Sequence, residues 1–444
     1  NISNKIIYLI VFLSSILFFY VLYKYFYVYG NIDSNNASKI YTDYYQPYIV
    51  FFVIFIPFWI LIIFFTNKLK PIILIIFTSV MFALYFVEIV FFSNIWLHFK
   101  KPYNFETYDK RSKIEVIQDL NDPNAVTAIS PKRIFINDDD IKEIVPLSGI
   151  SNSKTVMCNE RGEWIIYQSD RYGFNNPDTE WNQKEIEFFL VGDSFVMGNC
   201  VNRPHDISSV LREISNKSVL NIGYANNGTL LEYASLKEYI IPNIKNIIWV
   251  YYEKSDLDNL NNELKSNILR KYIDDISFKQ NLIFKQNEIN KILAELINEQ
   301  FQKELNSKKY FENNLSFKIR KFLDLWNVRE LLFFKNQSYS KKEFNPPDEF
   351  VKIIKLAENL ALKNNSNFHF VYLPSYNRYI SNFDNQEYEF VKKTINDLNI
   401  NFIDIHNEVF KKEENPLKLF PFKLPGHYTI EGYRKIAESI FNNI

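Results

Sequence analysis

Three nearly unbroken apolar runs open the chain, and short polar segments separate them. They cover Ile6 to Tyr23, Tyr48 to Phe65 and Ile72 to Phe92, and consist almost wholly of Ile, Leu, Val, Phe and Tyr. A helix of about 20 apolar residues crosses the hydrocarbon core of a bilayer. The pattern therefore predicts a transmembrane region of three helices within residues 1–95. Because no small-residue cleavage site follows the first run, we interpret it as an anchor and not a removed signal peptide.

Charged residues beside the runs leave the membrane orientation open. Lys68 and Lys70, between the second and third runs, favour an extracytoplasmic C-terminal part, whereas the basic residues from Lys100 to Arg111 argue the opposite way. Glu88 lies near the end of the third run, where a local pairing role is favoured over a proton or substrate path.

The pattern turns polar after residue 95. Residues 96–185 are rich in charge, Asn and Pro, which predicts a linker followed by a small accessory segment of short strands. Within it, Arg161-Gly162 is typical of a hairpin turn, and residues 175–178 are typical of a second compact turn.

Strand-like and helix-like segments alternate from residue 186 to residue 444. The first predicted strand ends at Gly192, and four more cover 218–224, 246–253, 368–373 and 401–405. Predicted helices cover 230–240 and 386–397. Such alternation predicts a parallel sheet with helices on both faces. Residues 258–345 form a polar stretch with Leu and Ile at helical spacing, which predicts a helical insertion. Either a lid or a solvated helical hairpin fits that stretch.

Charge and cysteine content exclude some function classes. The chain has 51 basic and 51 acidic residues, so no global field favours nucleic acid. Scattered His, Cys, Asp and Glu residues do not form a metal-ligand pattern, so we expect neither a metal nor another cofactor.

A candidate nucleophile and base stand at opposite ends of this alternating region. Ser194 follows Gly192-Asp193 at the end of the first strand, the edge at which open α/β sheets bind ligands. A serine hydroxyl needs a base to attack an ester. Among the five histidines, His427 is the one predicted to lie on a loop, just before the last helix.

These motifs, Gly192-Asp193-Ser194 and Gly426-His427-Tyr428, resemble those of the SGNH/GDSL hydrolase family over residues 188–444. The resemblance implies a flavodoxin-like, three-layer α/β/α domain at 186–444, with Ser194 as nucleophile and His427 as base. Esterases and acyltransferases make up the family, and we expect a membrane-anchored bacterial member.

The sequence departs from the family pattern around the histidine. Leu424 stands where the family carries the aspartate that orients the imidazole. Either a Ser-His dyad suffices, or another acid supplies the hydrogen bond, with Asp404 and Glu431 as candidates.

The oxyanion hole also departs from the pattern. The resemblance implies donors at the Ser194 amide and at the positions aligned with Asn226 and Ser255, where the family has glycine and asparagine. Ser255 is shorter than asparagine, and loss of one donor typically costs about 10²- to 10³-fold in turnover.

Two cysteines remain, Cys158 and Cys200, which form either one disulfide or two buried thiols. Resemblance to envelope esterases favours the disulfide and a periplasmic catalytic domain on a multi-pass inner-membrane protein. A disulfide would hold the segment around Cys158 beside Ser194.

Two functional hypotheses follow. The first is a membrane-anchored serine esterase acting on O-acyl groups, acetyl in the favoured case, of an envelope glycan or a small ester. The alternative is a catalytically degenerate module that binds a glycan or partner, or an O-acyltransferase accessory protein that works with a membrane partner protein. Ser194 and His427 favour the enzyme, whereas Leu424, Asn226 and Ser255 favour the binder.

Overall fold

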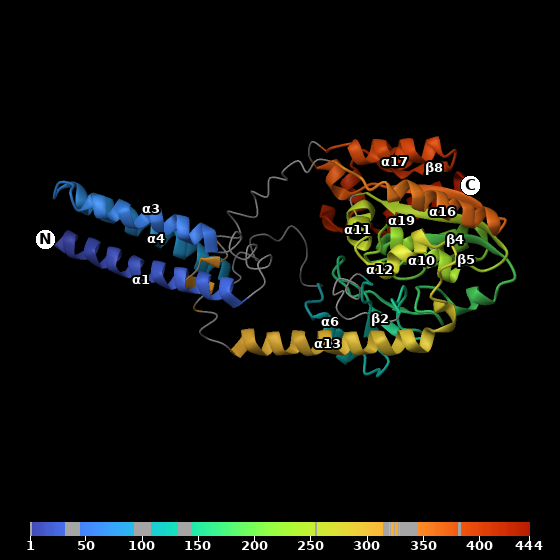
Figure 1. Cartoon of the computed structure of the whole chain (residues 1–444), viewed down its shortest axis with the longest axis horizontal. Coiled ribbons are helices and arrows are strands. Elements are labelled where there is room, and N and C mark those ends of the chain that lie inside the picture. Colours follow the sequence, from blue (N-terminus) through green and yellow to red (C-terminus); the bar gives the residue numbers. More distant parts are fainter. Residues whose placement is uncertain are drawn as a thin grey trace. The chain divides into compact units, whose positions relative to one another are not determined.

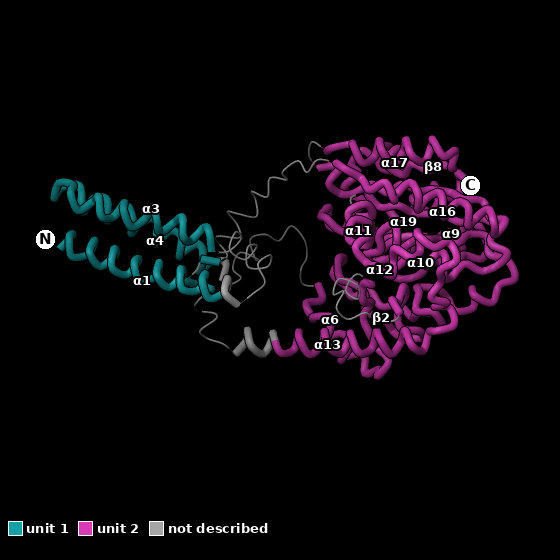
Figure 2. The backbone as a smooth tube through the Cα atoms, viewed as in Figure 1, with its two compact units in different colours: residues 1–100, 314–338 teal, residues 101–313, 339–444 magenta. Residues whose placement is uncertain are grey.

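The computed structural model describes residues 2–31, 45–92, 108–131, 144–253, 255–313, 344–380 and 383–444, and residues 319, 321–323, 325, 326 and 328. The chain divides into two compact units, which Figure 2 colours separately. The first comprises residues 1–100 and 314–338, and the second comprises 101–313 and 339–444.

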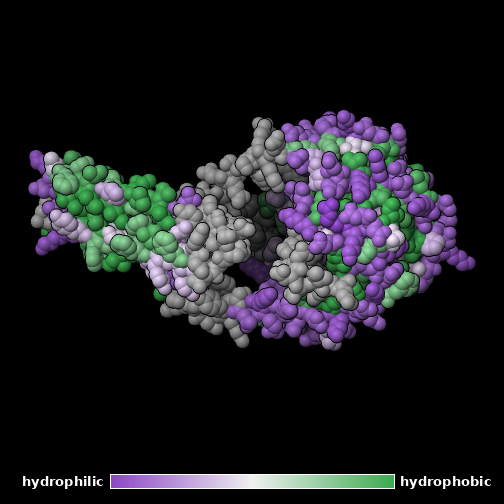
Figure 3. Space-filling view, in the orientation of Figure 1, coloured by the Kyte–Doolittle hydropathy of each residue, from purple (hydrophilic) through white to green (hydrophobic). Residues whose placement is uncertain are grey.

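Apolar helices make up most of the described part of the first unit: α1 (Ile2–Asn31), α3 (Gln46–Ile62) and α4 (Leu69–Phe92). They pack around Ile7, Trp59, Ile62 and Leu74. Most other large apolar side chains of these helices are exposed, and the visible surface of the unit is largely hydrophobic (Figure 3). Such a surface suits a lipid environment.

The prediction of three transmembrane helices needs correction. Among the described residues, two helical stretches are long and apolar enough to cross a bilayer, Ile2–Tyr27 and Leu69–Val90. The helix predicted at Tyr48 to Phe65 exists as α3, but it has 17 residues. At a rise of 1.5 Å per residue it is about 26 Å long, which is less than the ~30 Å hydrocarbon core.

The second unit contains a five-stranded parallel sheet among its described residues (Figure 1). Its strands are β4 (Ile186–Gly192), β5 (Val219–Asn221), β6 (Ile244–Tyr252), β7 (Asn367–Leu373) and β8 (Asn401–Asp404). They lie in the order β5-β4-β6-β7-β8. Counted from β4, this is the order 2-1-3-4-5 of flavodoxin-like doubly wound sheets. The predicted flavodoxin-like α/β architecture is therefore present.

Helices cover both faces of this sheet. Successive side chains of β4 point to opposite faces, and both sets are buried, so each face needs a covering layer. Phe189 and Val191 face a core that α10 (Thr229–Tyr239), α16 (Glu349–Lys363) and α17 (Gln386–Asp397) complete. Phe188 and Leu190 face the other core, with α9 (Ile207–Ser215) and α19 (Ile430–Asn442). Short helices fill the connections: α8 (Ser194–Met197), α18 (Ile405–Glu408), η3 (Asp178–Asn182), η5 (Tyr376–Tyr379), η6 (Phe410–Lys412), η7 (Pro416–Leu419) and η8 (Pro421–Lys423).

The accessory segment contains α6 (Lys113–Asp119) and a small sheet of β1 (Val126–Thr127), β2 (Lys154–Val156) and β3 (Ile166–Gln168). β2 and β3 are antiparallel, and bonds between Met157 and Ile165 and between Ile165 and Cys158 extend their ladder. The loop between them contains Arg161 and Gly162, with Gly162 at φ +91°. The predicted hairpin is therefore present.

The insertion between β6 and β7 is helical where it is described: α11 (Asp256–Glu263), α12 (Asn267–Asp274), η4 (Leu282–Phe284) and α13 (Gln286–Asn313). α13 buries Ile289, Leu293 and Ile297. Gln286 and Asn290 donate hydrogen bonds to the Gly149 carbonyl and to the Ser151 hydroxyl. These contacts attach α13 to the accessory segment. Its buried apolar side chains join the same core cluster as those of the sheet. Residues 329–343 lie outside the described part.

Candidate active site

Ser194 is the first residue of α8, and one residue, Asp193, separates it from β4. The Asp193 carboxylate caps this helix by accepting a hydrogen bond from the Phe195 N–H at 2.9 Å. Burial raises the pKa of Asp193 to about 6, because desolvation outweighs that hydrogen bond. Asp193 therefore holds the turn that presents the serine, the role expected of a capping residue.

The turn after β5 packs directly against the turn that carries Ser194. A Cβ added to Gly223 would lie 2.5 Å from Val196 Cβ and 2.7 Å from the Met197 nitrogen. The Asn221 side chain donates to the Val196 carbonyl at 2.6 Å and accepts from the Gly223 N–H at 2.8 Å. A glycine is therefore required at 223 for this close approach.

His427 lies on the loop between η8 and α19, and its Nε2 is 2.9 Å from Ser194 Oγ. Two neighbouring residues hold the loop in place. The buried Tyr428 hydroxyl donates to the Pro374 carbonyl at 2.7 Å, and Thr429 caps α19 by accepting from the Gly432 N–H. The Phe195 ring lies 4.7 Å from the imidazole, centroid to centroid, and fixes one side of it.

The acid that contacts His427 is Glu160, which sequence reasoning did not single out. Glu160 Oε1 lies 2.9 Å from His427 Nδ1, and Oε2 accepts from the His427 backbone N–H at 2.6 Å. With the Nδ1 proton donated to this carboxylate, Nε2 keeps its lone pair for the Ser194 proton. The three residues have the connectivity of a Ser-His-acid triad.

Electrostatics around Glu160 favour its charged form. Partial burial raises the cost of ionisation, but the hydrogen bonds and charge of His427 outweigh that cost. The pKa of Glu160 consequently lies below the ordinary glutamate value. A charged carboxylate at this position stabilises the imidazolium that forms when His427 takes a proton.

The two acids proposed from the sequence have other partners. Asp404 caps α18, accepting from the Asn407 N–H at 3.1 Å and from the Tyr388 hydroxyl at 2.5 Å. Glu431 is paired with Lys418 and Lys435. In the described part of the chain neither carboxylate hydrogen-bonds His427, so Glu160 occupies the place suggested for them.

Cys158 and Cys200 are joined as a disulfide, with Cα atoms 5.5 Å apart. The disulfide links the loop that carries Glu160 to the segment after α8. Cys200 Sγ lies 3.6 Å from His427 Nδ1. This pairing was the available signal for Glu160, because it predicts that residues near Cys158 lie beside Ser194.

Glu160, Cys200 and His427 also present potential metal-ligand atoms within 4.8 Å of one another. A metal-binding cysteine is a thiolate, whereas Cys200 is consumed in the disulfide. His427 Nδ1 is already in contact with Glu160. These contacts favour the hydrogen-bonded triad of Ser194, His427 and Glu160 over a metal centre at Glu160, Cys200 and His427.

Asn259 connects the two candidate oxyanion-hole positions. Asn226 has φ +60°, a conformation that asparagine tolerates. Asn259 Nδ2 donates to the Asn226 carbonyl at 3.4 Å and to Ser255 Oγ at 3.2 Å. Because Ser255 accepts this bond, its own hydroxyl proton can be directed to another acceptor.

Buried carboxyl groups lie behind this turn. Glu263 accepts from the N–H groups of Gly228 and Leu230 at 2.6 and 3.0 Å, and so fixes the start of α10. Burial, followed by neighbouring acids, raises the pKa of Glu232 and of Asp256 well above the ordinary values. Loss of hydration therefore disfavours the charged form of both groups.

Comparison with known proteins adds little to the assignment of the fold and of the site. No protein-family model and no curated protein sequence matches the chain. Solved structures do match, among them a "putative lipolytic protein of G-D-S-L family" from Desulfitobacterium hafniense DCB-2. That match has 13% identity and a TM-score of 0.32, and it covers 59% of this chain and 100% of the other. At this similarity the fold assignment rests on the strand order above, and the site assignment rests on its geometry.

Proposed function

We propose that this protein is a serine ester hydrolase of the SGNH type that forms an acyl-enzyme on Ser194. The observation that carries the proposal is the hydrogen-bonded chain from Glu160 through His427 to Ser194, with distances of 2.9 Å at each side of the imidazole. A complete triad favours catalysis over the binding-module alternative, because it removes the argument from Leu424 that an orienting acid is lacking.

The proposed reaction has two steps. Ser194 Oγ attacks the acyl carbonyl carbon while His427 Nε2 takes the serine proton. When the tetrahedral intermediate collapses, His427 returns that proton to the departing alcohol, leaving an ester on Ser194. Water then attacks this ester with His427 again as base, which releases the carboxylic acid and restores the serine.

Stabilisation of the oxyanion falls to three proposed donors. These are the Ser194 N–H, the Asn226 N–H and the Ser255 hydroxyl, with Asn259 holding the last two together. Hydrogen-bond donors that are already in position lower the barrier because no reorganisation is needed as charge develops.

For the substrate, we propose an O-acyl ester, acetyl in the favoured case, on an envelope glycan or a similar alcohol. The Cys158–Cys200 disulfide supports a catalytic unit on the periplasmic side, since disulfides persist in oxidising compartments. The apolar helices α1 and α4 support attachment to the inner membrane. An acyltransferase would use the same acyl-enzyme and replace water with a sugar hydroxyl, with a membrane partner protein delivering the acyl group.

The test is hydrolysis of a short-chain acyl ester by the full chain in detergent, with fluorophosphonate labelling as a second measurement. We compare the native chain, Ser194→Ala and Ser277→Ala, in which an exposed serine is changed. Hydrolysis and labelling that disappear only in Ser194→Ala support the proposal. A folded native chain with neither activity nor labelling contradicts it and favours the binding module.

A further inference from the structure

Part of the helical insertion belongs to the first unit and not to the unit in which the insertion begins. Residues 314–338 group with residues 1–100, whereas α13 before them groups with the sheet unit (Figure 2). The described residues here lie between Ile319 and Val328, and we call them the docking segment. The chain thus passes between the two units three times: after residues 100, 313 and 338.

The docking segment contacts one face of α4. The Tyr85 hydroxyl donates to the Leu323 carbonyl at 3.0 Å, and the Tyr85 and Phe322 rings lie 5.4 Å apart. One helical turn further along α4, Glu88 Oε2 accepts from the Val328 N–H at 3.0 Å. Residues three apart on a helix share a face, so Tyr85 and Glu88 form one docking surface.

Glu88 and Val328 are both buried where they contact each other. The Glu88 side chain is fully buried, and Val328 is 5% exposed. A carboxylate near membrane depth is costly unless hydrogen-bond donors surround it. The docking segment supplies such a donor from its backbone, which accounts for an acidic residue in this apolar part of α4.

Three apolar side chains of the docking segment are exposed. Ile319, Leu323 and Trp326 are 49%, 59% and 37% exposed. Lys321 Nζ lies 5.4 Å from the centre of the Trp326 ring. Exposed aliphatic side chains beside tryptophan and lysine are typical of an element at a membrane interface.

The position of this contact along α4 also favours lipid as the partner of the docking segment. The apolar stretch of α4 that could cross a bilayer covers Leu69–Val90, so Tyr85 and Glu88 lie in its last two turns. An element packed there on a membrane-spanning helix would meet the boundary between acyl chains and head groups.

We propose that the docking segment is a membrane-interface element, held on α4 through Glu88 and Tyr85, with its exposed apolar side chains against lipid acyl chains. The proposal rests on the proposed membrane attachment of α1 and α4. It does not depend on the esterase chemistry. The insertion then gives the catalytic unit a second attachment to the membrane, in addition to the chain that follows α4.

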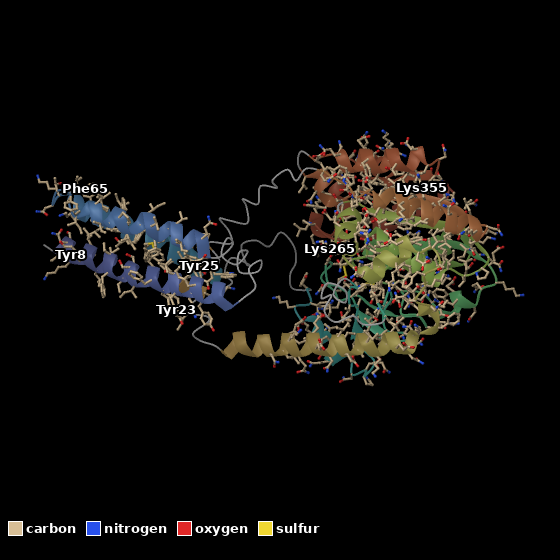
Figure 4. The ribbon with its side chains drawn as sticks, viewed as in Figure 1. Tyr8, Tyr23, Tyr25, Phe65, Lys265 and Lys355 are labelled. Atoms are coloured by element: carbon tan, nitrogen blue, oxygen red, sulfur yellow. A yellow bond between two sulfur atoms is a disulfide. The ribbon has the colours of Figure 1, made fainter. Side chains whose placement is uncertain are left out.

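The test places an environment-sensitive fluorophore on Leu323→Cys in the full chain, reconstituted in lipid nanodiscs. Cys158 and Cys200 form a disulfide and do not react with the thiol-directed label. The control is Lys265→Cys, which lies on the second unit (Figure 4). We expect lipids that carry a shallow quencher to quench the Leu323 label severalfold more than the Lys265 label. Equal quenching at the two positions overturns the proposal.

A pair of Glu88 variants tests the mode of docking. Glu88→Gln retains an oxygen acceptor for the Val328 N–H, and Glu88→Leu removes it. Quenching at Leu323 should persist in Glu88→Gln and fall in Glu88→Leu. If Glu88→Leu fails to reconstitute, the Leu323 label in the otherwise native chain still decides whether lipid is the partner.

Ester hydrolysis measured on the same nanodiscs keeps the two proposals distinct. Quenching at Leu323 without hydrolysis supports the docking segment and counts against the proposed enzyme. Hydrolysis without preferential quenching supports the enzyme and overturns the docking segment.

Discussion

The carboxylate of Glu160 binds His427 twice, through the ring Nδ1 and through the backbone N–H. The two residues come from different parts of the chain, a hairpin loop before the sheet and the loop before the last helix. A carboxylate that holds both the ring and the main chain fixes the imidazole in position and in tautomer, as the acid of a catalytic triad must.

Replacement of Glu160 by Gln should lower kcat strongly. The amide keeps the size of the side chain but loses the charge that stabilises the imidazolium. Loss of the orienting acid costs up to about 10⁴-fold in kcat where it belongs to a true triad. Steady-state ester hydrolysis checks this, together with thermal unfolding to verify folding.

The matched control is Glu163→Gln, an exposed glutamate on the same loop. It should hydrolyse the ester at the native rate. If Glu160→Gln and Glu163→Gln behaved alike, a Ser-His dyad would describe the site better than a triad.

Gly426→Ala should reduce activity while leaving the fold intact. A Cβ at this position would lie 2.5 Å from Glu160 Oε2, and the nearest atoms all belong to that flexible side chain. The carboxylate can therefore move away, which breaks its bond to the His427 N–H. We expect a lower kcat with an unchanged thermal midpoint. Native activity in Gly426→Ala would show that this contact is dispensable.

The sheet and the turn that carries Ser194 could be predicted from the sequence because their signals are local. The buried strand before Ser194 shows as an apolar run, and the last helix begins at a recognisable cap, Thr429. Predicted strand positions consequently lie within a few residues of those in β4 to β8.

Glu160 could not be predicted in the same way, because its role depends on tertiary contacts. It lies in a polar loop of the accessory segment, far in sequence from His427, whereas Asp404 lies at the end of a strand and looked better placed. Asp404 serves instead to cap α18. The docking segment was missed for a similar reason, since its helical spacing does not reveal that Glu88 is its partner.

Reduction of the Cys158–Cys200 disulfide should lower activity. The disulfide ties the Glu160 loop to the segment after Ser194, and without it the loop loses its covalent link to the site. Cys158→Ser combined with Cys200→Ser should lose about as much kcat as Glu160→Ala. Thermal unfolding of the double variant separates loss of the site from loss of the fold. Full activity in a reducing buffer, with both thiols shown to be free, would contradict this prediction.

Asn259→Ala and Ser255→Ala should have coupled effects on kcat. If Asn259 positions the Ser255 hydroxyl as an oxyanion donor, each variant should cost up to about 10²-fold. The double variant should then cost much less than the product of the two. A double-mutant cycle on kcat provides the measurement, with KM expected to change little. Effects that multiply would mean that the two side chains act independently.

Glu232→Gln should make folding stability less sensitive to alkaline pH. The raised pKa of Glu232 means that the folded state holds a proton that the unfolded state releases at lower pH. Folding stability therefore falls as pH rises from the unfolded pKa, about 4.3, towards the folded pKa. Gln cannot ionise, so the advantage of the variant in thermal midpoint should grow as the pH rises above the unfolded glutamate pKa of about 4.3. Glu438→Gln, which changes an exposed carboxylate, is the control. A constant difference between Glu232→Gln and the native chain across this range would show that Glu232 does not carry the extra proton.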